Sequence, residues 1–264
     1  MTEKQDTVDK SQGLILGSQM YYKQSDMIDS IQHRPDFDKI FKFSKVVSDG
    51  DGRRFGYTTK WPNISDIKFQ PLNELIPFSG NLPLYLDCEW YTDKREDDLI
   101  DELLNKFQTW WEFRSDVKIS DIIKLCGTRK EEVGERYYIK NSWHIIIRFG
   151  DFTFSNQTQM KIVLKKFENW CITDSLCMSK FSFECPKSGK PRPIIDFSVY
   201  NKNAGTYQNF RVPYGIKYEE SDALIPTELD VCVTDLFVSY PVEDSVPIEL
   251  PKDWVIPPKV HHQY

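Results

Sequence analysis

The sequence lacks the features that mark secreted, zinc-binding or membrane proteins. Its six cysteines form no CxxC pair and no close group with histidine, which argues against a structural zinc site or a disulfide framework. No apolar run approaches the roughly 20 residues that span a membrane, and the polar N-terminal region does not resemble a secretory signal. These absences predict an intracellular, soluble protein of the nucleus or cytoplasm that does not bind membranes.

An excess of positive charge is also missing, because the formal net charge is −6 at pH 7. This excludes a protein that coats nucleic acid without selectivity. The charge is unevenly distributed, however: residues 177–217 contain seven Lys and Arg and two acids, whereas residues 218–264 contain ten acids and two lysines. A basic segment followed by an acidic one predicts an anionic ligand that is bound locally.

The pattern of apolar residues predicts an α/β (α+β) fold in three parts. Residues 1–80 are expected to form a small N-terminal α/β module whose first 12 residues are disordered, with helical patches over 27–47 and a plain connection over 62–80. Residues 81–245 alternate strands (82–91, 117–125, 137–149, 193–200) with amphipathic helices (99–110, 160–171), an order that resembles split βαβ, RRM-like sheets. Residues 246–264 contain four prolines and are expected to be an extended, weakly ordered tail.

Two carboxylates interrupt the apolar strand predicted over residues 82–91. Because successive side chains of a strand alternate faces, Asp87 and Glu89 point to one side, and Cys88 and Trp90 to the other. Neighbouring carboxylates repel and raise each other's pKa unless a cation lies between them, and a divalent metal ion is the usual solution. The alternative interpretation is an edge strand with two acids on its solvated face.

A second polar line follows the strand predicted over residues 137–149. Lys140, Ser142 and His144 alternate along it and share one face, whereas Asn141 and Trp143 lie on the other. A lysine, a hydroxyl and an imidazole aligned in this way can bind phosphate, since all three can donate hydrogen bonds. The alternative is that His144 is a hydrogen-bonded structural residue.

A third acid, Asp196, follows two isoleucines in the strand predicted over residues 193–200. Three acids in apolar strands suggest a two-metal site, which lowers the pKa of an attacking hydroxyl and neutralises a transferring phosphate. Arg211 and Lys217 follow closely in the sequence and can supply positive charge to a triphosphate.

Three ordered segments carry a resemblance to a known family: LYLDCE at residues 84–89, KNSWHII at 140–146, and IDFSVY at 195–200 followed by QNFR at 208–211 and Lys217. They resemble the motifs of the archaeo-eukaryotic primase superfamily, with the primase-polymerase (PrimPol) and herpesvirus primases as the nearest branch. The resemblance covers Leu84 to Lys217, about half of the chain. It implies an RRM-like catalytic sheet beside a smaller N-terminal α/β module.

The resemblance also implies an activity, namely a DNA primase or primase-polymerase that adds nucleotides to a 3′ hydroxyl and releases pyrophosphate. The implied partners are a single-stranded DNA template, a primer and nucleoside triphosphates, with a replicative helicase as a further candidate. The implied residue roles are Mg²⁺ or Mn²⁺ binding by Asp87, Glu89 and Asp196, contacts to the phosphates of the nucleotide by Lys140, Ser142, His144, Arg211 and Lys217, and a place near nucleotide and template for Arg54.

The chain departs from the family pattern at two places. No zinc quartet follows the catalytic part, which makes extension of a primer a firmer expectation than its initiation, and residues 201–207 are an insertion within the third motif. Two alternative functions remain open from the residues: a metal-dependent nuclease that uses the same acids, and an inactive adaptor that binds nucleic acid or a replication partner. The chain is interpreted as a stand-alone enzyme of a virus or mobile element, or as a catalytic fragment.

Overall fold

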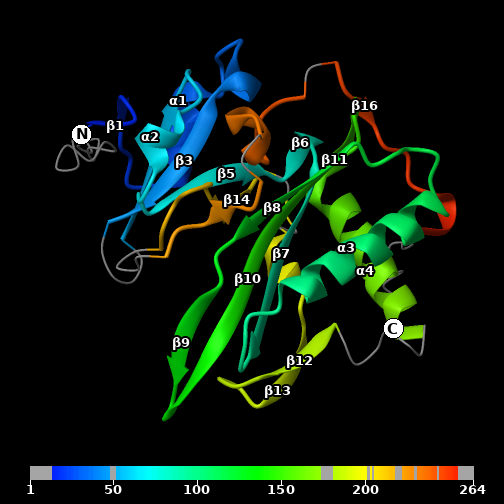
Figure 1. Cartoon of the computed structure of the whole chain (residues 1–264). Helices are drawn as coiled ribbons and strands as arrows, with labels where there is room; N and C mark the ends of the chain where they lie inside the picture. Colours follow the sequence, from blue (N-terminus) through cyan, green and yellow to red (C-terminus); the bar gives the residue numbers. More distant parts are fainter. Residues whose placement is uncertain are drawn as a thin grey trace, which may run out of the picture.

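The computed structural model describes residues 14–47, 52–173, 181–200, 203, 205–217, 222–228, 231–242 and 244–254. Over these residues the chain has a mixed α+β fold whose sheets are mostly antiparallel (Figure 1). Within the described ranges, no helix is both long and apolar enough to cross a membrane. The first 12 residues, which the sequence predicts to be disordered, lie outside the described residues.

A five-stranded antiparallel sheet carries the two polar lines found in the sequence. Its strands run in the order β15-β8-β10-β7, with β9 paired to the far end of β10. Their bounds are β7 Leu84–Thr92, β8 Asp121–Cys126, β9 Arg129–Val133, β10 Arg136–Arg148 and β15 Ile225–Pro226. Strands β7 and β10 confirm the predictions for 82–91 and 137–149, whereas β8 begins four residues later than predicted.

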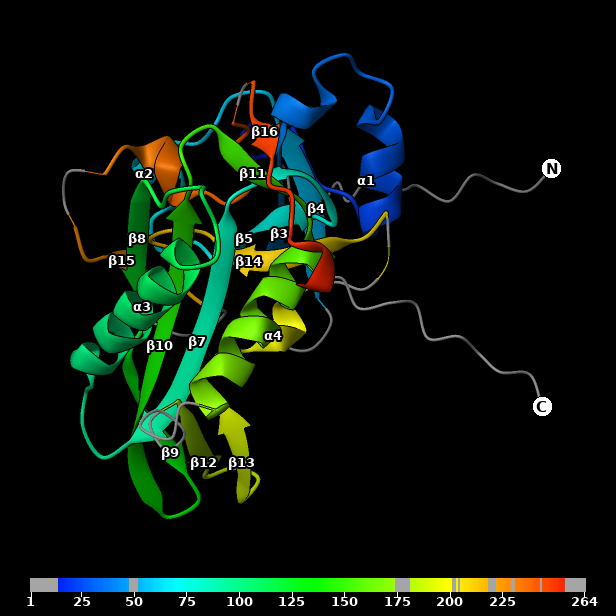
Figure 2. The same cartoon turned by 90° about the vertical axis from the view of Figure 1, so that its right-hand side faces the viewer.

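Two helices cover one face of this sheet, as Figure 2 shows. They are α3, Asp97–Glu112, and α4, Gln157–Thr173, and they confirm both predicted amphipathic helices. The helices pack on each other through aromatic rings, because Phe167 of α4 lies 5.2 Å from Phe107 and 5.6 Å from Trp110 of α3. The buried side of β7, including Cys88 and Trp90, faces this aromatic layer, so Asp87 and Glu89 lie on the opposite face of the sheet.

The strand predicted over residues 193–200 is wrong in its extent. Residue Ile195 forms only an isolated antiparallel bridge with Cys88, after which Phe197–Val199 turns into a short 3-10 helix, η3. Two prolines, Pro191 and Pro193, remove backbone donors before the bridge. After the bridge, the side chain of Asp196 accepts a hydrogen bond from the backbone of Ser198 at 2.8 Å, and this cap ends the extended segment.

A second sheet has four strands in the order β14-β5-β3-β4 and lies away from helices α3 and α4 (Figure 1). The bounds are β3 Phe41–Val46, β4 Arg53–Thr58, β5 Leu72–Pro77 and β14 Tyr207–Arg211. The sequence pattern predicts helix at β3 and a plain connection at β5, and both predictions are wrong. Central strands buried on both faces lose the alternation that identifies a strand, and the prolines around β5 mark its ends instead of breaking it.

Strand β14 ties the two predicted modules together. It comes from residues that the sequence analysis assigned to the catalytic module, yet it pairs antiparallel with β5 of the N-terminal module. Helix α1, Gln24–Ile31, packs on one side of this sheet through Met27 and Ile31. The other side contacts the five-stranded sheet through Phe210, whose ring lies 5.1 Å from that of Tyr85 on β7.

Short elements complete the chain. They are β1 Leu14–Ile15, β2 Ser18–Gln19, η2 Phe37–Lys39, α2 Ile64–Ile67, β6 Ser79–Leu82, β11 Phe152–Asn156, β12 Ser182–Cys185, β13 Lys190–Pro193, η4 Val233–Leu236, β16 Val246–Pro247 and η5 Lys252–Trp254. The predicted loose tail is wrong for its first nine residues, because β16 pairs with β11 and Trp254 stacks on Trp110 at 5.1 Å. Burial of Ile248 and Trp254 outweighs the effect of Pro247 and Pro251 in this segment.

Residues 235–239 fasten the two sheets to each other. Glu74, at the centre of β5, accepts hydrogen bonds from the backbone of Val238 (3.2 Å) and from the backbone and hydroxyl of Ser239 (2.9 and 2.7 Å). Arg148, at the end of β10, donates to the carbonyl oxygens of Asp235 (2.9 Å) and Phe237 (3.3 Å). Burial raises the pKa of Glu74 to about 7, although its hydrogen bonds and Arg148 act in the opposite direction.

This raised pKa predicts a pH-dependent stability. Because folded Glu74 holds its proton more tightly than the unfolded chain does, the free energy of unfolding should fall as the pH rises from about 4.5 to about 7, by up to about 3 kcal/mol. Glu74→Gln cannot ionise and should reduce this slope to the part that Asp87, whose pKa is also raised to about 7, contributes, whereas Glu132→Gln, at an exposed position of β9, should keep the full slope. Urea denaturation across this pH range checks the prediction, and parallel curves for all three proteins would contradict it.

Candidate active site

Strand pairing brings the two predicted polar lines together. In the register of β7 and β10, Asp87 lies opposite His144 and Glu89 lies opposite Ser142. The ammonium group of Lys140 forms an ion pair with Glu89, with 2.7 Å between Nζ and Oε1. The distance between His144 Nε2 and Asp87 Oδ1 is 3.8 Å, which is too long for a hydrogen bond. Five of the predicted site residues therefore share one face, opposite α3 and α4.

Asp196 lies beside this face through the backbone of its extended segment. Its N–H donates to the carbonyl oxygen of Asp87 at 2.8 Å, and the N–H of Glu89 donates to Ile194 at 2.8 Å. The carboxylate of Asp196 turns toward Ser198 and accepts from the backbone N–H at 2.8 Å and from the hydroxyl at 2.9 Å. Accordingly, no three His, Cys, Asp or Glu side chains of the described residues form a closed metal-binding group.

The electrostatics of this face centre on Asp87. Burial raises the pKa of Asp87 to about 7, and the negative charges of Glu89 and Asp196 act in the same direction. Lys140 and Arg211 oppose the rise without cancelling it. A carboxyl group that is buried next to two other acids is stabilised in its charged form by an added cation.

His144 is held as a neutral imidazole against an aromatic ring. Its ring lies almost parallel to that of Phe210, with 4.0 Å between the ring centroids and 22° between the planes. Burial lowers the pKa of His144 well below its usual value, and the positive charges of Arg211, Lys217 and Lys140 lower it further. The lysines and the arginine predicted from the sequence therefore act on the same histidine.

Three buried polar atoms on this face have no hydrogen-bond partner within the described part of the chain. They are Oδ1 of Asp87, Oγ of Ser142 and Nδ1 of His144. Leaving a buried polar group unsatisfied costs about 1–3 kcal/mol, so such groups are uncommon outside sites that bind a ligand. Their occurrence on three neighbouring residues of two paired strands makes this face a candidate ligand site.

Gly127, which the sequence analysis did not assign to the site, makes room for Arg211. A Cβ atom at Gly127 would lie 2.9 Å from a terminal nitrogen of Arg211, closer than real Cβ contacts allow. The N–H of Gly127 donates to the carbonyl oxygen of Ser142 at 2.8 Å, and Thr128 Oγ1 accepts from the N–H of Ser142 at 3.2 Å. No local sequence signal identifies this role, because it depends on contact between β14 and the turn after β8.

Arg54 is the predicted site residue that lies farthest from the acids by strand order. It is on β4, which is separated from β14 by β5 and β3, and so about 14 Å from it across the sheet. Its guanidinium lies over the ring of Tyr22, 4.5 Å from the centroid. The structure therefore brings together Asp87, Glu89, Lys140, Ser142, His144 and Asp196, has Arg211 and Lys217 near enough for their charges to act on His144, and places Arg54 apart.

The acids of this face fit a divalent cation. Asp87 supplies a buried oxygen without a partner, Glu89 is partly exposed on the same side, and Asp196 adjoins both. Carboxylate oxygens are the ligands that Mg²⁺ and Mn²⁺ prefer. Asp196 accepts one hydrogen bond from Ser198 on each carboxylate oxygen, and each oxygen keeps a lone pair that can bind the ion.

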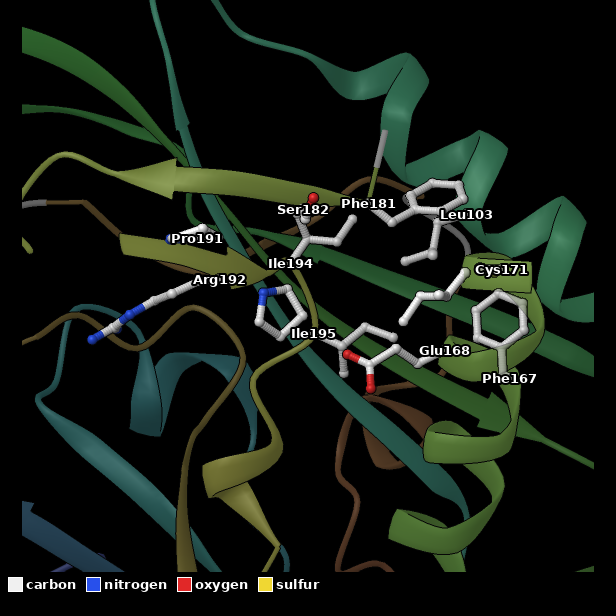
Figure 3. A pocket seen from close by; sticks show the side chains of 12 residues that line it. Leu103, Phe167, Glu168, Cys171, Phe181, Ser182, Pro191, Arg192, Ile194 and Ile195 are labelled. Atoms are coloured by element: carbon white, nitrogen blue, oxygen red, sulfur yellow. The ribbon is translucent and has the colours of Figure 1, made fainter. Parts of the chain in front are cut away.

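An apolar pocket lies on the other side of the Asp196 segment. It has a volume of about 270 Å³ and lies between α3, α4 and the β12–β13 hairpin, with Leu103, Phe167, Cys171, Ile194 and Ile195 among its lining residues (Figure 3). The side chain of Arg192 points away from the apolar residues in this view. The pocket thus belongs to the helix side of the sheet and is separate from the acids.

Comparisons with models of known protein families and with curated proteins find no match to this chain.

The fit to a cation predicts metal-dependent stability. Excess Mn²⁺ should raise the melting temperature of the protein, because a ligand at about 100 times its Kd adds about 2.7 kcal/mol. Asp87→Asn should raise the melting temperature without metal, since it removes a buried repulsion, and should abolish the response to Mn²⁺. Asp98→Asn, at an exposed position of α3, should respond like the parent protein. An equal Mn²⁺ shift in all three proteins, measured by differential scanning fluorimetry, would contradict the site.

Proposed function

We propose that this protein is a template-directed DNA primase-polymerase of the archaeo-eukaryotic primase type. It transfers a nucleotide from a nucleoside triphosphate to the 3′ hydroxyl of a primer, on a single-stranded DNA template. The reaction forms a bond between the 3′ oxygen and the α-phosphorus, breaks the bond to the β-phosphate, and releases pyrophosphate and the proton of the hydroxyl.

The connectivity of the sheet supports this proposal. The chain passes through β7, α3, β8, β10 and α4 before it returns to the bridge at Ile195. Across the sheet the order is bridge, β7, β10 and β8, with every neighbouring pair antiparallel and both helices on one face. This order resembles that of split βαβ, RRM-like folds, although the fourth strand is reduced to a single bridge, and the resemblance supports the proposal.

One observation carries the proposal: the β7–β10 register sets two acids directly opposite a serine and a histidine whose polar atoms lack partners. The pairs are Asp87 with His144 and Glu89 with Ser142. Motif resemblance alone concerns the order of residues along the chain. The pairing of β7 with β10 brings the first two motifs to one face of the sheet. The backbone hydrogen bonds at Asp196 bring the third motif beside them.

The acidic side chains of the site are suited to bind metal ions, and its basic and neutral side chains are suited to bind phosphate. Divalent cations held by Asp87, Glu89 and Asp196 would lower the pKa of the attacking hydroxyl and offset negative charge on the reacting phosphate. Arg211 and Lys217 supply positive charge on the side of His144, as their effect on its pKa indicates. Ser142 and neutral His144 can donate hydrogen bonds without adding charge.

The ion pair between Lys140 and Glu89 allows the lysine to exchange one negatively charged partner for another. At 2.7 Å, Lys140 neutralises Glu89. When Glu89 binds a cation, the ammonium group becomes available to a phosphate oxygen, so the same lysine balances charge in both states. A nuclease, which acts on water and a phosphodiester, has less need of this lysine together with Arg211 and Lys217.

The proposal predicts metal-dependent primer extension. Asp87→Asn with Glu89→Gln should lower the extension rate at least about 100-fold, because electrostatic stabilisation by such groups contributes that much or more. The assay uses a labelled primer on a DNA template with Mg²⁺ or Mn²⁺ and each nucleoside triphosphate in turn. Asp98→Asn serves as the matched acid control. Primer shortening without nucleoside triphosphate indicates the nuclease instead, and extension that persists in the double variant removes the assignment.

The close approach of Gly127 to Arg211 predicts a selective defect. Gly127→Ala should displace the guanidinium and raise the KM for nucleoside triphosphate about tenfold, which corresponds to the lower end of the roughly 1.5–3 kcal/mol that loss of one charge-assisted contact costs. In an Arg211→Ala background the same substitution should cost little more, because the group it displaces is absent. Steady-state kinetics on all four proteins check this coupling, and additive effects would contradict it.

A further inference from the structure

The face that carries the candidate site continues beyond it along the extended ends of β7, β10 and β9. Side-chain alternation puts Arg136, Tyr138 and Lys140 of β10 on the face of Ser142 and His144, and Tyr91 of β7 on the face of Glu89. The register pairs Lys140 with Arg129 of β9. We call Tyr91, Arg129, Arg136, Tyr138 and Lys140 the distal stripe.

Aromatic rings lie along the distal stripe and on the hairpin beside it. Tyr138 meets Tyr91 edge to face at 6.4 Å, and Phe183 of β12 lies 6.2 Å from Tyr91. Figures 1 and 2 both show the β9–β10 and β12–β13 hairpins projecting together from the same end of the molecule. These rings are only partly buried, in contrast to the rings between α3 and α4.

Positive charge accompanies these rings. Lys187, in the turn of the β12–β13 hairpin, forms an ion pair with Glu131 of β9 and lies 5.9 Å from the centroid of Tyr91. Arg129 also contacts Glu131, at 3.4 Å, and the hydroxyl of Tyr91 donates to the same carboxylate at 3.1 Å. Glu131 therefore fixes the hairpins to each other, while Arg129, Arg136, Lys140 and Lys187 leave this region with positive charge in excess.

We infer that the distal stripe binds single-stranded nucleic acid and guides it to the acids at Asp87 and Glu89. This inference rests on the proposed function, and it adds the residues that contact the strand. The stripe and the candidate site together extend about 27 Å along β10, from Arg136 to His144, at a rise of about 3.4 Å per residue in a strand. Cations for the phosphates interleaved with aromatic rings for the bases are the features that single strands require.

The observations favour a nucleic acid over an acidic peptide. A peptide carboxylate is satisfied by the lysine and arginine groups alone and does not need aromatic faces. Bases, by contrast, stack on partly exposed rings whatever their sequence. The stripe also runs into the candidate site without a break, since Lys140 belongs to both. Continuity of this kind is expected for a substrate that must present a reactive end to the acids.

Adjacent tyrosines provide a matched test of the stacking contact. Tyr138 lies on the distal stripe, whereas Tyr137 lies on the opposite face of the same strand, is 59% exposed and lies under Lys130. Tyr138→Leu should weaken binding of a labelled oligothymidine about tenfold or more, in line with the usual contribution of one stacked base. Tyr137→Leu should stay within about twofold of the parent protein. Fluorescence anisotropy, without nucleotide or metal, measures both.

A second pair of variants tests the charges. Arg136→Ala and Lys187→Ala should each reduce the slope of log K against log salt by about 0.7, the value for one phosphate contact on a single strand. Lys130→Ala, on the opposite face, should leave the slope unchanged. Equal effects of Tyr137→Leu and Tyr138→Leu, or of Lys130→Ala and Arg136→Ala, would overturn the inference.

Two further outcomes are decisive. Preferential binding of a labelled polyglutamate peptide, with Tyr138→Leu without effect, would assign the stripe to an acidic protein partner. Failure of the stripe and failure of the proposed function remain distinguishable, because primer extension depends on Asp87 and Glu89 and is measured separately. Extension that is lost in the acid variants, together with DNA binding that is unaffected by Tyr138→Leu, would keep the enzyme and relocate its template path.

Discussion

The structure depends on one energetically unfavourable arrangement, the burial of the Asp87 carboxyl group beside two other acids. The opposite face of β7 is occupied by Cys88 and Trp90 in the aromatic layer, so the strand cannot turn Asp87 toward solvent without exposing that core. The strand register thus forces the acid onto the inner face, where burial and its neighbours raise its pKa to about 7. A cation is the simplest group that would relieve the repulsion between these acids.

The positive groups of the site come from a different sheet than the negative ones. Asp87 and Glu89 belong to β7, whereas Arg211 ends β14, which is hydrogen-bonded to β5 of the four-stranded sheet. Contact between the two sheets is made by aromatic packing, with Phe210 between Tyr85 and His144. The ring of Phe210 therefore sets the position of the histidine and, through the backbone, that of the neighbouring Arg211.

The sequence alone predicted those helices and strands in which apolar residues recur at a regular spacing. It also predicted which side chains share one face of a strand. The face shared by Asp87 and Glu89, and that shared by Lys140, Ser142 and His144, follow from a period of two and are reproduced by β7 and β10. Their mutual register did not follow, because it is set by pairing between residues about 55 positions apart in a long antiparallel ladder. The roles of Gly127 and Phe210 were inaccessible for the same reason, as both depend on contacts between distant segments.

The elements that the sequence misassigned are those in which local and tertiary preferences compete. In β5, prolines suggested a loop, but strands on both sides supply partners and the prolines fall at its ends. At Asp196, the apolar residues before it suggested a continuing strand, but its own side chain caps the turn at Ser198.

That cap has a consequence for the site. The two oxygens that accept from Ser198 are the same ones that a cation would bind, and each keeps a second lone pair, so metal binding and the local backbone conformation of residues 196–198 are coupled through one carboxylate. The third acid therefore belongs to a local turn, while Asp87 and Glu89 are fixed by the sheet.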